Sequence, residues 1–477
     1  KDYELYRLTE HVNTDAKTGE VLQGYATYTS SDPRSFANKI MSYLAKAEIL
    51  IRVEHINDKQ HPKEQDNLKE RFAIGVMRAA NERLVRLVQP MLQGSYAFYI
   101  TVRGGVIGGR CILRKNAEGR TITDITPWDP MHTHYGVDDE GLAWACYKIK
   151  KTRQQIQNEY GVVLPGEERT TAGSTDAEME GEYIYDFYDK ETNQVVMGNE
   201  QVLKRPTRHG SPRVPVGMIM IGNMPLIQPQ MTSGVIADVG ESIYESIRNT
   251  ISKYNDIMSM VLELVSRSRK QPLKVFSADG QKTLPEDPLV TGTTISLRKG
   301  DEDIEPIKLL EMARDTGTFL QIISTEIQRG SLSHTTYGEI AFQLSGYAIN
   351  TLKQGIESVL ASRLTALEQI TLQQVNLLYD QYMTEHFQPM ERSGVAQGRK
   401  YFSQMIIPQE LWGTCDYQVK VMSQLPQDDM AKYTMAQIAR SGVVPLLADD
   451  FILDKVLGIQ DSEQAQNQVK AQQAERG

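Results

Sequence analysis

The sequence predicts an α+β fold, with mixed helices and strands in the first half and long helices in the second. Two observations predict this division. Short β-like runs separated by glycine-rich turns dominate residues 96–150, whereas after residue 233 apolar residues recur every three or four positions. The chain has 477 residues, 40% hydrophobic and 24% charged, which is typical of a globular protein large enough for several packed parts.

The N-terminal part is predicted to begin with two helices. Pro33 follows a Ser-Ser-Asp stretch, a favourable helix start, and apolar residues at helical spacing predict a helix over 33–50. A longer amphipathic helix is predicted over 63–93, where Pro90 kinks or ends it.

Strands follow these helices. The runs YAFYITV, RCILRK and TITDITP alternate in polarity, and LAWACYKIKK continues the pattern after a turn at Val137–Gly141. A short helix over 152–160, a polar loop over 165–181 and a hairpin formed by EYIYDFYDK and QVVMGN complete the α+β part.

The second half consists of long helices around one short β excursion. Ser233–Ser268 would form a helix roughly 50 Å long at 1.5 Å per residue. The elements expected after it are β-like runs over 272–306, a returning helix over 307–329, a polar interruption at Gly330–Glu339, a very long helix over 346–386, helical segments with turns, and a frayed or disordered tail after Asp461.

Charge and composition exclude some functions. The net charge of −9, from 52 basic and 61 acidic residues, argues against a surface that grips nucleic acid tightly. No run of eighteen apolar residues occurs, so we expect no membrane span. The three widely spaced cysteines Cys111, Cys146 and Cys415 fit a reducing compartment.

No stretch reaches the standard of a catalytic motif. GGVIGG (104–109) is followed by Arg110 and Cys111, and therefore lacks the Lys-Ser/Thr pair of a phosphate-binding loop; a turn between strands is expected. His132 and His134 could share one side of a strand but lack a second ligand pair, so no metal or cofactor is expected.

Two acidic residues keep an enzymatic alternative open. Asp186 and Asp189 could act as an acid and base pair in a hydrolase, although their aromatic surroundings are typical of a half-exposed strand. We expect no catalytic residues and retain this hydrolase as an alternative.

A basic run lies at the predicted end of the first long helix. It contains Arg267, Arg269, Lys270 and Lys274. These cations could simply suit the negative end of the helix dipole, or they could contact phosphates or a partner protein.

The order of elements, together with four local stretches, resembles the portal proteins of tailed bacteriophages. These stretches are GYATYTSSDPRSFANKI (24–40), RGGVIGGRCILRK (103–115), ITPWDPMHTHYGVDDEGLAWACYK (125–148) and YGEIAFQLSGYAINTLKQ (337–354). The resemblance covers nearly the whole chain. It implies a wing at 1–232, a stem helix at 233–269, a clip at 270–306, a second stem helix at 307–329, a tunnel loop at 330–345, a long wing helix at 346–400, and a C-terminal wing or crown region with a flexible tail at 401–477.

The resemblance also implies a function and partners. Portal proteins form a ring of about twelve copies at one capsid vertex, through which double-stranded DNA is packaged and ejected. The partners would be the terminase large subunit, the major capsid protein and tail-side adaptors. The chain would reside in the virion, and in the host cytoplasm during assembly. The acids of the stem, which include Asp256 and Glu263, would line a wall that repels DNA weakly.

Two sets of residues would face these partners. Lys270 and its basic neighbours would lie at the clip, which docks terminase and then adaptors. The tunnel loop would meet DNA through Arg329, Ser331, Ser333, His334, Thr335, Thr336 and Tyr337. A head–tail adaptor, or another structural virion protein without DNA passage, is the main alternative.

Overall fold

The fold is mixed α and β in the computed structural model, and the chain divides into two compact units. Unit 1 comprises Lys1–Lys39 and Ile243–Ala341, and unit 2 comprises Ile40–Ser242 and Phe342–Gly477. The residues that the structure describes are 1–15, 17–53, 63–116, 118–162, 181–198, 201–222, 240, 242–269, 273–277, 279–280, 295–298, 300, 302–306, 316–332, 346–384, 386–395, 401–411, 416–422, 436–438, 452–453, 466 and 469–474.

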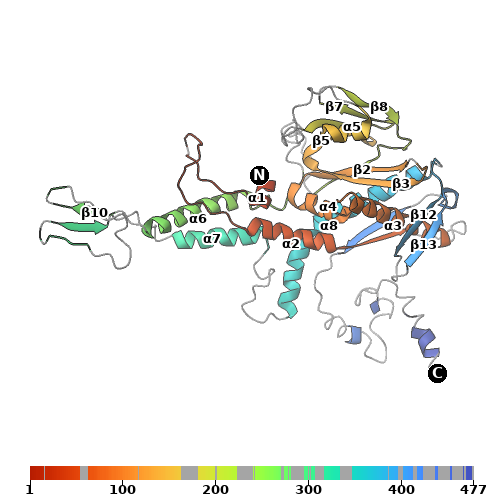
Figure 1. The fold of residues 1–477 in the computed structure, drawn as a ribbon. Coiled ribbons are helices and arrows are strands. Elements are labelled where there is room, and N and C mark those ends of the chain that lie inside the picture. Colours follow the sequence, from red (N-terminus) through yellow and green to blue (C-terminus); the bar gives the residue numbers. More distant parts are fainter. Residues whose placement is uncertain are drawn as a thin grey trace. The chain divides into compact units, whose positions relative to one another are not determined.

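Unit 1 is built on two antiparallel helices. Ser246 Oγ donates a hydrogen bond to the carbonyl of Gly330 at 2.9 Å, so α7 (Thr316–Gly330) ends where α6 (Arg248–Arg269) begins. Figure 1 shows the two helices side by side, with the hairpin of β10 (Leu273–Phe276) and β11 (Asp303–Pro306) beyond their outer ends. The unit also contains α1 (Asp2–Arg7) and the first part of α2 (Asp32–Lys46).

Unit 2 contains four antiparallel sheets among its described residues. One has the order β3–β2–β9 and another the order β4–β5–β6–β7–β8, while β1 pairs with β14 and β12 with β13. The strands are β1 (Glu48–Val53), β2 (Val106–Lys115), β3 (Thr121–Trp128), β4 (Thr133–Asp138), β5 (Gly141–Thr152), β6 (Gly181–Tyr188), β7 (Thr192–Met197), β8 (Val202–Arg208), β9 (Val216–Met220), β12 (Met390–Val395), β13 (Tyr401–Ile406) and β14 (Tyr417–Met422).

Helices pack on these sheets and complete their hydrogen bonding. The helices are the second part of α2, α3 (Lys63–Arg86), α4 (Leu92–Phe98), α5 (Arg153–Tyr160) and α8 (Gly346–Tyr382). Gln381 of α8 donates to the carbonyl of Cys111 and accepts from the amide of Leu113, each at 2.9 Å. The buried side-chain amide of Gln381 therefore forms hydrogen bonds with two backbone groups of β2. These bonds fix the position of α8 along the strand.

A buried charge cluster stabilises unit 2. The Asp124 side chain is 1% exposed and forms ion pairs with Arg83, Arg110 and Arg114 at 2.9, 3.0 and 3.1 Å. Burial alone would raise the pKa of Asp124, yet the three guanidinium groups hold it below its ordinary value. Arg110 also reaches Asp186 of β6 at 3.2 Å, and thereby links the two larger sheets.

The structure corrects several predictions for the first half. The helix predicted over 33–50 ends at Lys46, because Glu48–Val53 pairs with the distant strand Tyr417–Met422. The predicted strand YAFYITV is helical: α4 runs directly into a π-helical turn at Tyr99–Arg103. The glycine turn lies at Gly104–Gly105, where both residues have a positive φ. It connects the π-helical turn to β2, and therefore does not join two strands as predicted.

The long elements differ in extent from the predictions. The helix predicted from 233 begins only at Arg248, and Gly240 has a φ of 89° that no helix accommodates. The helix predicted over 346–386 extends to Tyr382, with Gly355 inside it. The C-terminal part, predicted to be helical, contains β12, β13 and β14. The predicted strands RCILRK, TITDITP and LAWACYKIKK, the hairpin β6–β7, and α5 are confirmed.

Asp124→Asn should lower the free energy of unfolding by about 3 kcal/mol near neutral pH, because it leaves buried guanidinium groups uncompensated. The native pKa of Asp124 is depressed, so its contribution is complete above the unfolded value of about 3.9 and is lost as the pH falls through the lower native value. Urea unfolding at several pH values measures this.

The matched control is Glu118→Gln, which removes the exposed ion pair with Arg120 at 3.3 Å and should cost less than about 0.5 kcal/mol. A destabilisation of Asp124→Asn that does not shrink in acid would show that the loss is not caused by charge pairing.

Candidate functional site

The candidate interaction surface among the described residues is the pair of helices α6 and α7 in unit 1. The two helices contact each other through apolar side chains near the start of α6 and the end of α7, where Ile247, Ile251, Ile323 and Ile327 are buried. Farther along, large apolar side chains are exposed instead. They are Met260 (61% exposed), Leu262, Val265, Phe319 and Ile322 (53%).

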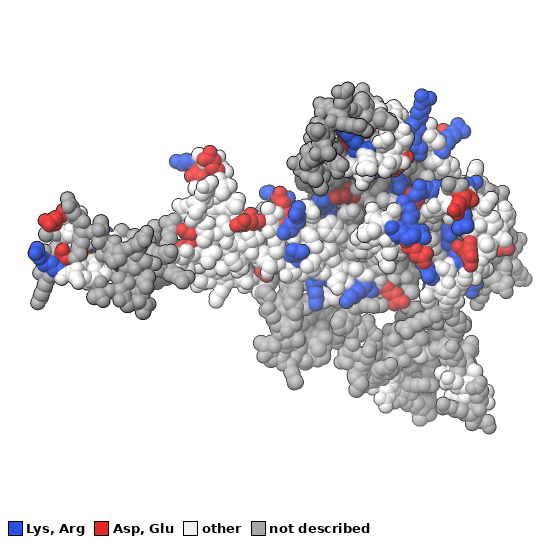
Figure 2. Space-filling model, in the orientation of Figure 1, with Lys and Arg blue, Asp and Glu red and all other residues white. Residues whose placement is uncertain are grey.

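This exposed apolar set is concentrated on one pair of elements. Figure 2 shows a largely uncharged surface along α6 and α7. Large exposed apolar side chains gathered on one pair of helices favour an interaction site. The pair therefore has the composition of helices that pack against further copies or partners.

A different face of α6 holds the N-terminal segment by hydrogen bonds. Backbone amides of alternate residues, Ser30, Tyr28 and Ala26, donate to Asn255 Oδ1 (3.0 Å), Ser259 Oγ (2.9 Å) and Glu263 Oε2 (2.7 Å). Two residues of extended chain span about 6.6 Å and four helical residues span about 6 Å, so the two spacings match.

These contacts change the interpretation of the acids on the stem. Glu263 accepts from Ala26, Asp256 contacts His11 at 3.0 Å, and Glu245 pairs with Arg248 at 2.9 Å. All three acids therefore have contacts within the chain, and the weakly repelling wall expected from them remains a prediction. The sequence signal that could have revealed the contact is the four-residue spacing of the acceptors at 255, 259 and 263.

The hairpin β10–β11 has two strands among the described residues. Lys274 is exposed and lies opposite Glu305, and Phe276, two residues farther along the strand, is 50% exposed. A two-stranded hairpin with exposed apolar residues is marginal alone, and no other strand of the described residues pairs with its outer edges.

The predicted basic run is only partly described. The helix α6 extends through positions 267 and 269 and ends at Arg269, whereas Lys270 lies outside the described residues. Both interpretations of the basic run, the helix dipole and a partner contact, stay predictions. Lys274 is separated from them on β10.

The predicted tunnel loop is described only at its start. Arg329 lies in the last turn of α7 and its Nη1 contacts Glu326 at 2.9 Å, while Ser331 Oγ donates to the carbonyl of Ile327 at 2.7 Å. The remaining five positions of the loop prediction, Ser333, His334, Thr335, Thr336 and Tyr337, lie outside the described residues.

Structural contacts account for the two carboxylates of the hydrolase alternative. Asp186 Oδ1 accepts from Asn193 at 2.8 Å, and Asp186 Oδ2 contacts Arg110 at 3.2 Å and Tyr188 at 3.3 Å. Asp189 accepts from the backbone amides of Glu191 and Thr192, which hold its pKa below its ordinary value against the opposing effect of burial.

Neither a metal site nor a membrane span is found in the described part of the chain. His132 and His134 are both exposed, and no three His, Cys, Asp or Glu side chains among the described residues could hold a metal together. None of the described helices combines the length and apolar character needed to cross a membrane.

Comparisons with known proteins give distant structural similarity only. No protein-family model matches the chain, and no curated protein sequence matches it. Among solved structures, it is similar to a chain in the neck of an empty GTA particle with C6 symmetry (TM-score 0.46, 10% identity, 90% of each chain covered). It is also similar to chains of the virion of a native gene transfer agent (GTA) particle (0.43, 11% identity, 90% and 89% covered) and of the native neck with C12 symmetry (0.42, 11%, 89% of each). Similarity at this level assigns neither fold nor function.

Asn255→Ala should free the N-terminal segment from α6. The amide of Ser30 is buried and would lose its acceptor, at a cost of about 1–3 kcal/mol. Hydrogen exchange of the amides of residues 26–30 should accelerate by about tenfold or more.

Ser252→Ala is the control, because the single hydrogen bond of that exposed hydroxyl within the described part of the chain goes to the carbonyl of Arg248 in its own helix. Equal exchange rates at Ser30 in both variants and in the unaltered chain would disprove the contact.

Proposed function

We propose that the chain is the portal subunit of a tailed bacteriophage, a ring at one capsid vertex that conducts double-stranded DNA during packaging and ejection. The observation that carries this proposal is the helical pair of unit 1 with its exposed apolar side chains. The order of a helix, a short β excursion and a returning helix also supports the proposal.

Physical considerations favour a closed ring of like copies. Helices of 22 and 15 residues that end in a two-stranded hairpin bury little apolar surface by themselves. Head-to-tail contacts between neighbouring copies would cover Met260, Phe319 and Ile322. Such contacts form a ring when the rotation from one copy to the next adds up to a full turn. About twelve copies follow from the sequence resemblance.

The hairpin β10–β11 is proposed as the docking surface for the terminase large subunit and, after packaging, for tail-side adaptors. Its outer edges could extend a sheet in a partner or in a neighbouring copy. Arg267, Arg269, Lys270 and Lys274 would add positive charge at its base. ATP hydrolysis would belong to the terminase, so the chain itself is proposed to have no catalytic role and no cofactor.

Segment 329–337 is proposed to face DNA in the channel. Apart from Arg329 it offers neutral hydroxyls and one histidine, which exchange hydrogen bonds with water readily and would let DNA slide. The major capsid protein would surround the ring in the virion, and assembly would take place in the host cytoplasm.

The purified chain should form rings, and glutamate at the exposed apolar positions should disrupt them. Met260→Glu and Ile322→Glu place a charge where a neighbour would bury the side chain, which should weaken each contact by about 2 kcal/mol or more. Mass photometry and negative-stain images measure ring mass and a central hole.

Two controls have similar exposure in unit 2: Met131→Glu (65% exposed) and Val202→Glu (51%). Both should assemble normally. A stable monomer of the unaltered chain at micromolar concentration over several salt conditions would rule out the proposal. Normal rings from the α6 and α7 variants would instead exclude this pair as the interface.

Adding positive charge to the loop should test DNA passage. Thr335→Lys combined with Thr336→Lys would add phosphate contacts in the channel, so packaging should slow or the retained DNA should shorten, while ring assembly stays normal. The measurement is the rate and length of DNA packaged into capsids.

The control Gln157→Lys with Asn158→Lys adds the same charge on the exposed face of α5 and should package normally. Wild-type rate and length with the loop variant would favour the alternative, a head–tail adaptor through which no DNA passes. Failure to form rings would show that the loop lies in an interface.

A further inference from the structure

The five-stranded sheet of unit 2 buries one of its faces and exposes the other. On the buried face, Ala145 and Tyr188 pack against the three-stranded sheet, and Ile184 packs against α5. Side chains alternate between the two faces of a strand, so the residues next to these lie on the opposite, outer face. There Trp144 is 36% exposed and Tyr183 is 45% exposed.

Aromatic rings form the centre of this outer face. Trp144 of β5 lies against Gly136 of β4, where a Cβ atom would clash with the indole, so the glycine lets the ring lie close to the strand. The ring of Phe187 on β6 lies 5.7 Å from that of Trp144 and is inclined to it by 23°. Tyr183 and Tyr185 continue the row of rings along β6. The sheet therefore holds several rings at one surface.

No carboxylate lies among these rings on the three central strands. The other positions of the outer face on β5, β6 and β7 include Cys146, Lys148, Lys150, Gln194 and Val196. The two acids of β6 lie on the opposite face, where Arg153 contacts Glu182 at 3.5 Å and Arg110 contacts Asp186 at 3.2 Å. The outer face of these strands is therefore positively charged.

The cations of this face have no acidic partner. The ammonium group of Lys148 lies 4.4 Å from the centre of the Tyr183 ring and 5.9 Å from that of Tyr185. Neither Lys148 nor the exposed Lys150 forms an ion pair within the described part of the chain. Arg208, opposite Thr192 at the edge strand β8, is also exposed. A ligand that is both negatively charged and rich in planar groups would complement this combination.

We propose that the outer face of the five-stranded sheet binds single-stranded nucleic acid. Bases would stack on Trp144 and Tyr183, and phosphates would pair with Lys148 and Lys150. Six residues of extended strand separate the two rings, about 20 Å, which several nucleotides can span. The proposal concerns unit 2 and does not depend on the ring function.

The outer face distinguishes this ligand from two others. A DNA duplex keeps its bases stacked inside the helix and would use the lysines but not the rings. An acidic peptide would likewise pair with the lysines and leave the rings without partners. The net charge of −9 opposes tight binding, so the affinity should be modest and should fall with added salt.

The probe is a fluorescent oligodeoxythymidine of about twelve nucleotides, added to the full-length chain and followed by fluorescence anisotropy. An abasic strand of the same length keeps the phosphates but lacks the bases. The oligodeoxythymidine should bind at least about fivefold tighter than the abasic strand, because stacking requires bases. An oligouridine of the same length identifies the sugar: either pyrimidine strand binding more tightly than the abasic strand supports the proposal.

Variants separate stacking from charge. Trp144→Leu and Tyr183→Leu should each weaken oligodeoxythymidine binding about fivefold or more and leave the abasic strand unaffected, whereas Tyr183→Phe keeps the ring and should bind normally. Lys148→Gln and Lys150→Gln should each reduce the slope of log affinity against log salt concentration by about 0.7. A merely structural role of these lysines would not change that slope.

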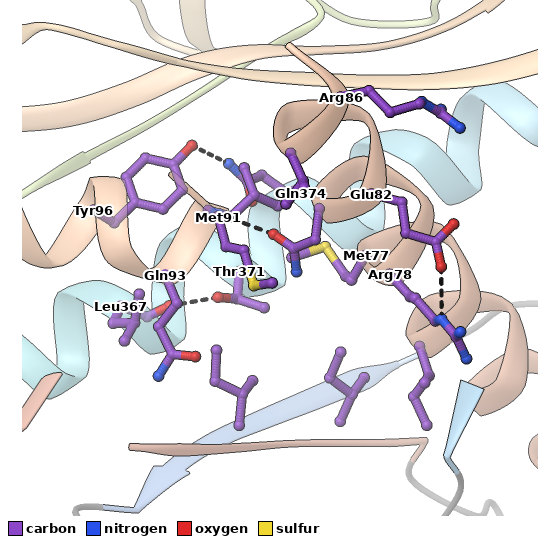
Figure 3. A pocket seen from close by; sticks show the side chains of 16 residues that line it. Met77, Arg78, Glu82, Arg86, Met91, Gln93, Tyr96, Leu367, Thr371 and Gln374 are labelled. Carbon is purple, nitrogen blue, oxygen red and sulfur yellow. Dashed lines mark hydrogen bonds and ion pairs between the residues drawn. The ribbon is translucent and has the colours of Figure 1, made fainter. Parts of the chain in front are cut away.

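The matched controls lie elsewhere in unit 2. Tyr401 is 65% exposed and has Arg78 5.8 Å from its ring, but Arg78 is paired with Glu82 at 2.9 Å. Figure 3 shows this ion pair. Tyr401→Leu should therefore leave binding within about twofold. Lys115→Gln removes an exposed lysine at the end of β2 and should leave the salt slope unchanged.

Equal affinity for the oligodeoxythymidine and the abasic strand would overturn the proposal, as would unchanged binding to Trp144→Leu and Tyr183→Leu. Tighter binding of a duplex or of polyglutamate would also overturn it, in favour of a simple phosphate or acidic-protein site. Binding to a dissociated form but not to assembled rings would overturn it in favour of an interface between copies. Ring mass, measured in parallel, should be the same for all of these variants, so the two proposals fail separately.

Discussion

Unit 1 depends on the three different faces of α6. One face packs isoleucines against α7. A second carries Asn255, Ser259 and Glu263, which accept hydrogen bonds from alternate amides of the N-terminal segment. The opposite side exposes Met260, and toward the end of α6 the isoleucine side continues as exposed Leu262 and Val265. The contacts within the chain leave these apolar side chains uncovered among the described residues, and such side chains gain stability when a partner covers them.

Unit 2 is organised around buried polar groups that need partners at specific positions. Asp124 gathers three arginines, and Arg110 extends the cluster to Asp186 on the neighbouring sheet. Gln381 of α8 serves the backbone of β2 in the same manner. Such groups are costly when unpaired, so they select one arrangement of helix and sheets over alternatives with similar apolar burial.

The helical pair of unit 1 exposes large apolar side chains that copies of the same chain could cover. Several of its charged side chains, among them Arg248, Asp256 and Glu263, already have contacts within the chain.

The sequence alone determined the local elements whose signals lie within a few residues. The strands at 110–127 and 142–151, the hairpin at 181–197 and the capped helix at 153–160 follow from alternation, turns and caps. Tertiary contacts decided the rest. Glu48–Val53 is a strand because a segment about 370 residues later pairs with it, and Tyr99–Arg103 is helical despite its β-branched residues. The sequence predicted helices around a β excursion and a basic helix end, but it could not show which face of α6 the N-terminal segment covers. The four-residue spacing of Asn255, Ser259 and Glu263 is visible in the sequence, but it does not identify the segment that covers this face, because the bonded residues lie more than 200 positions apart.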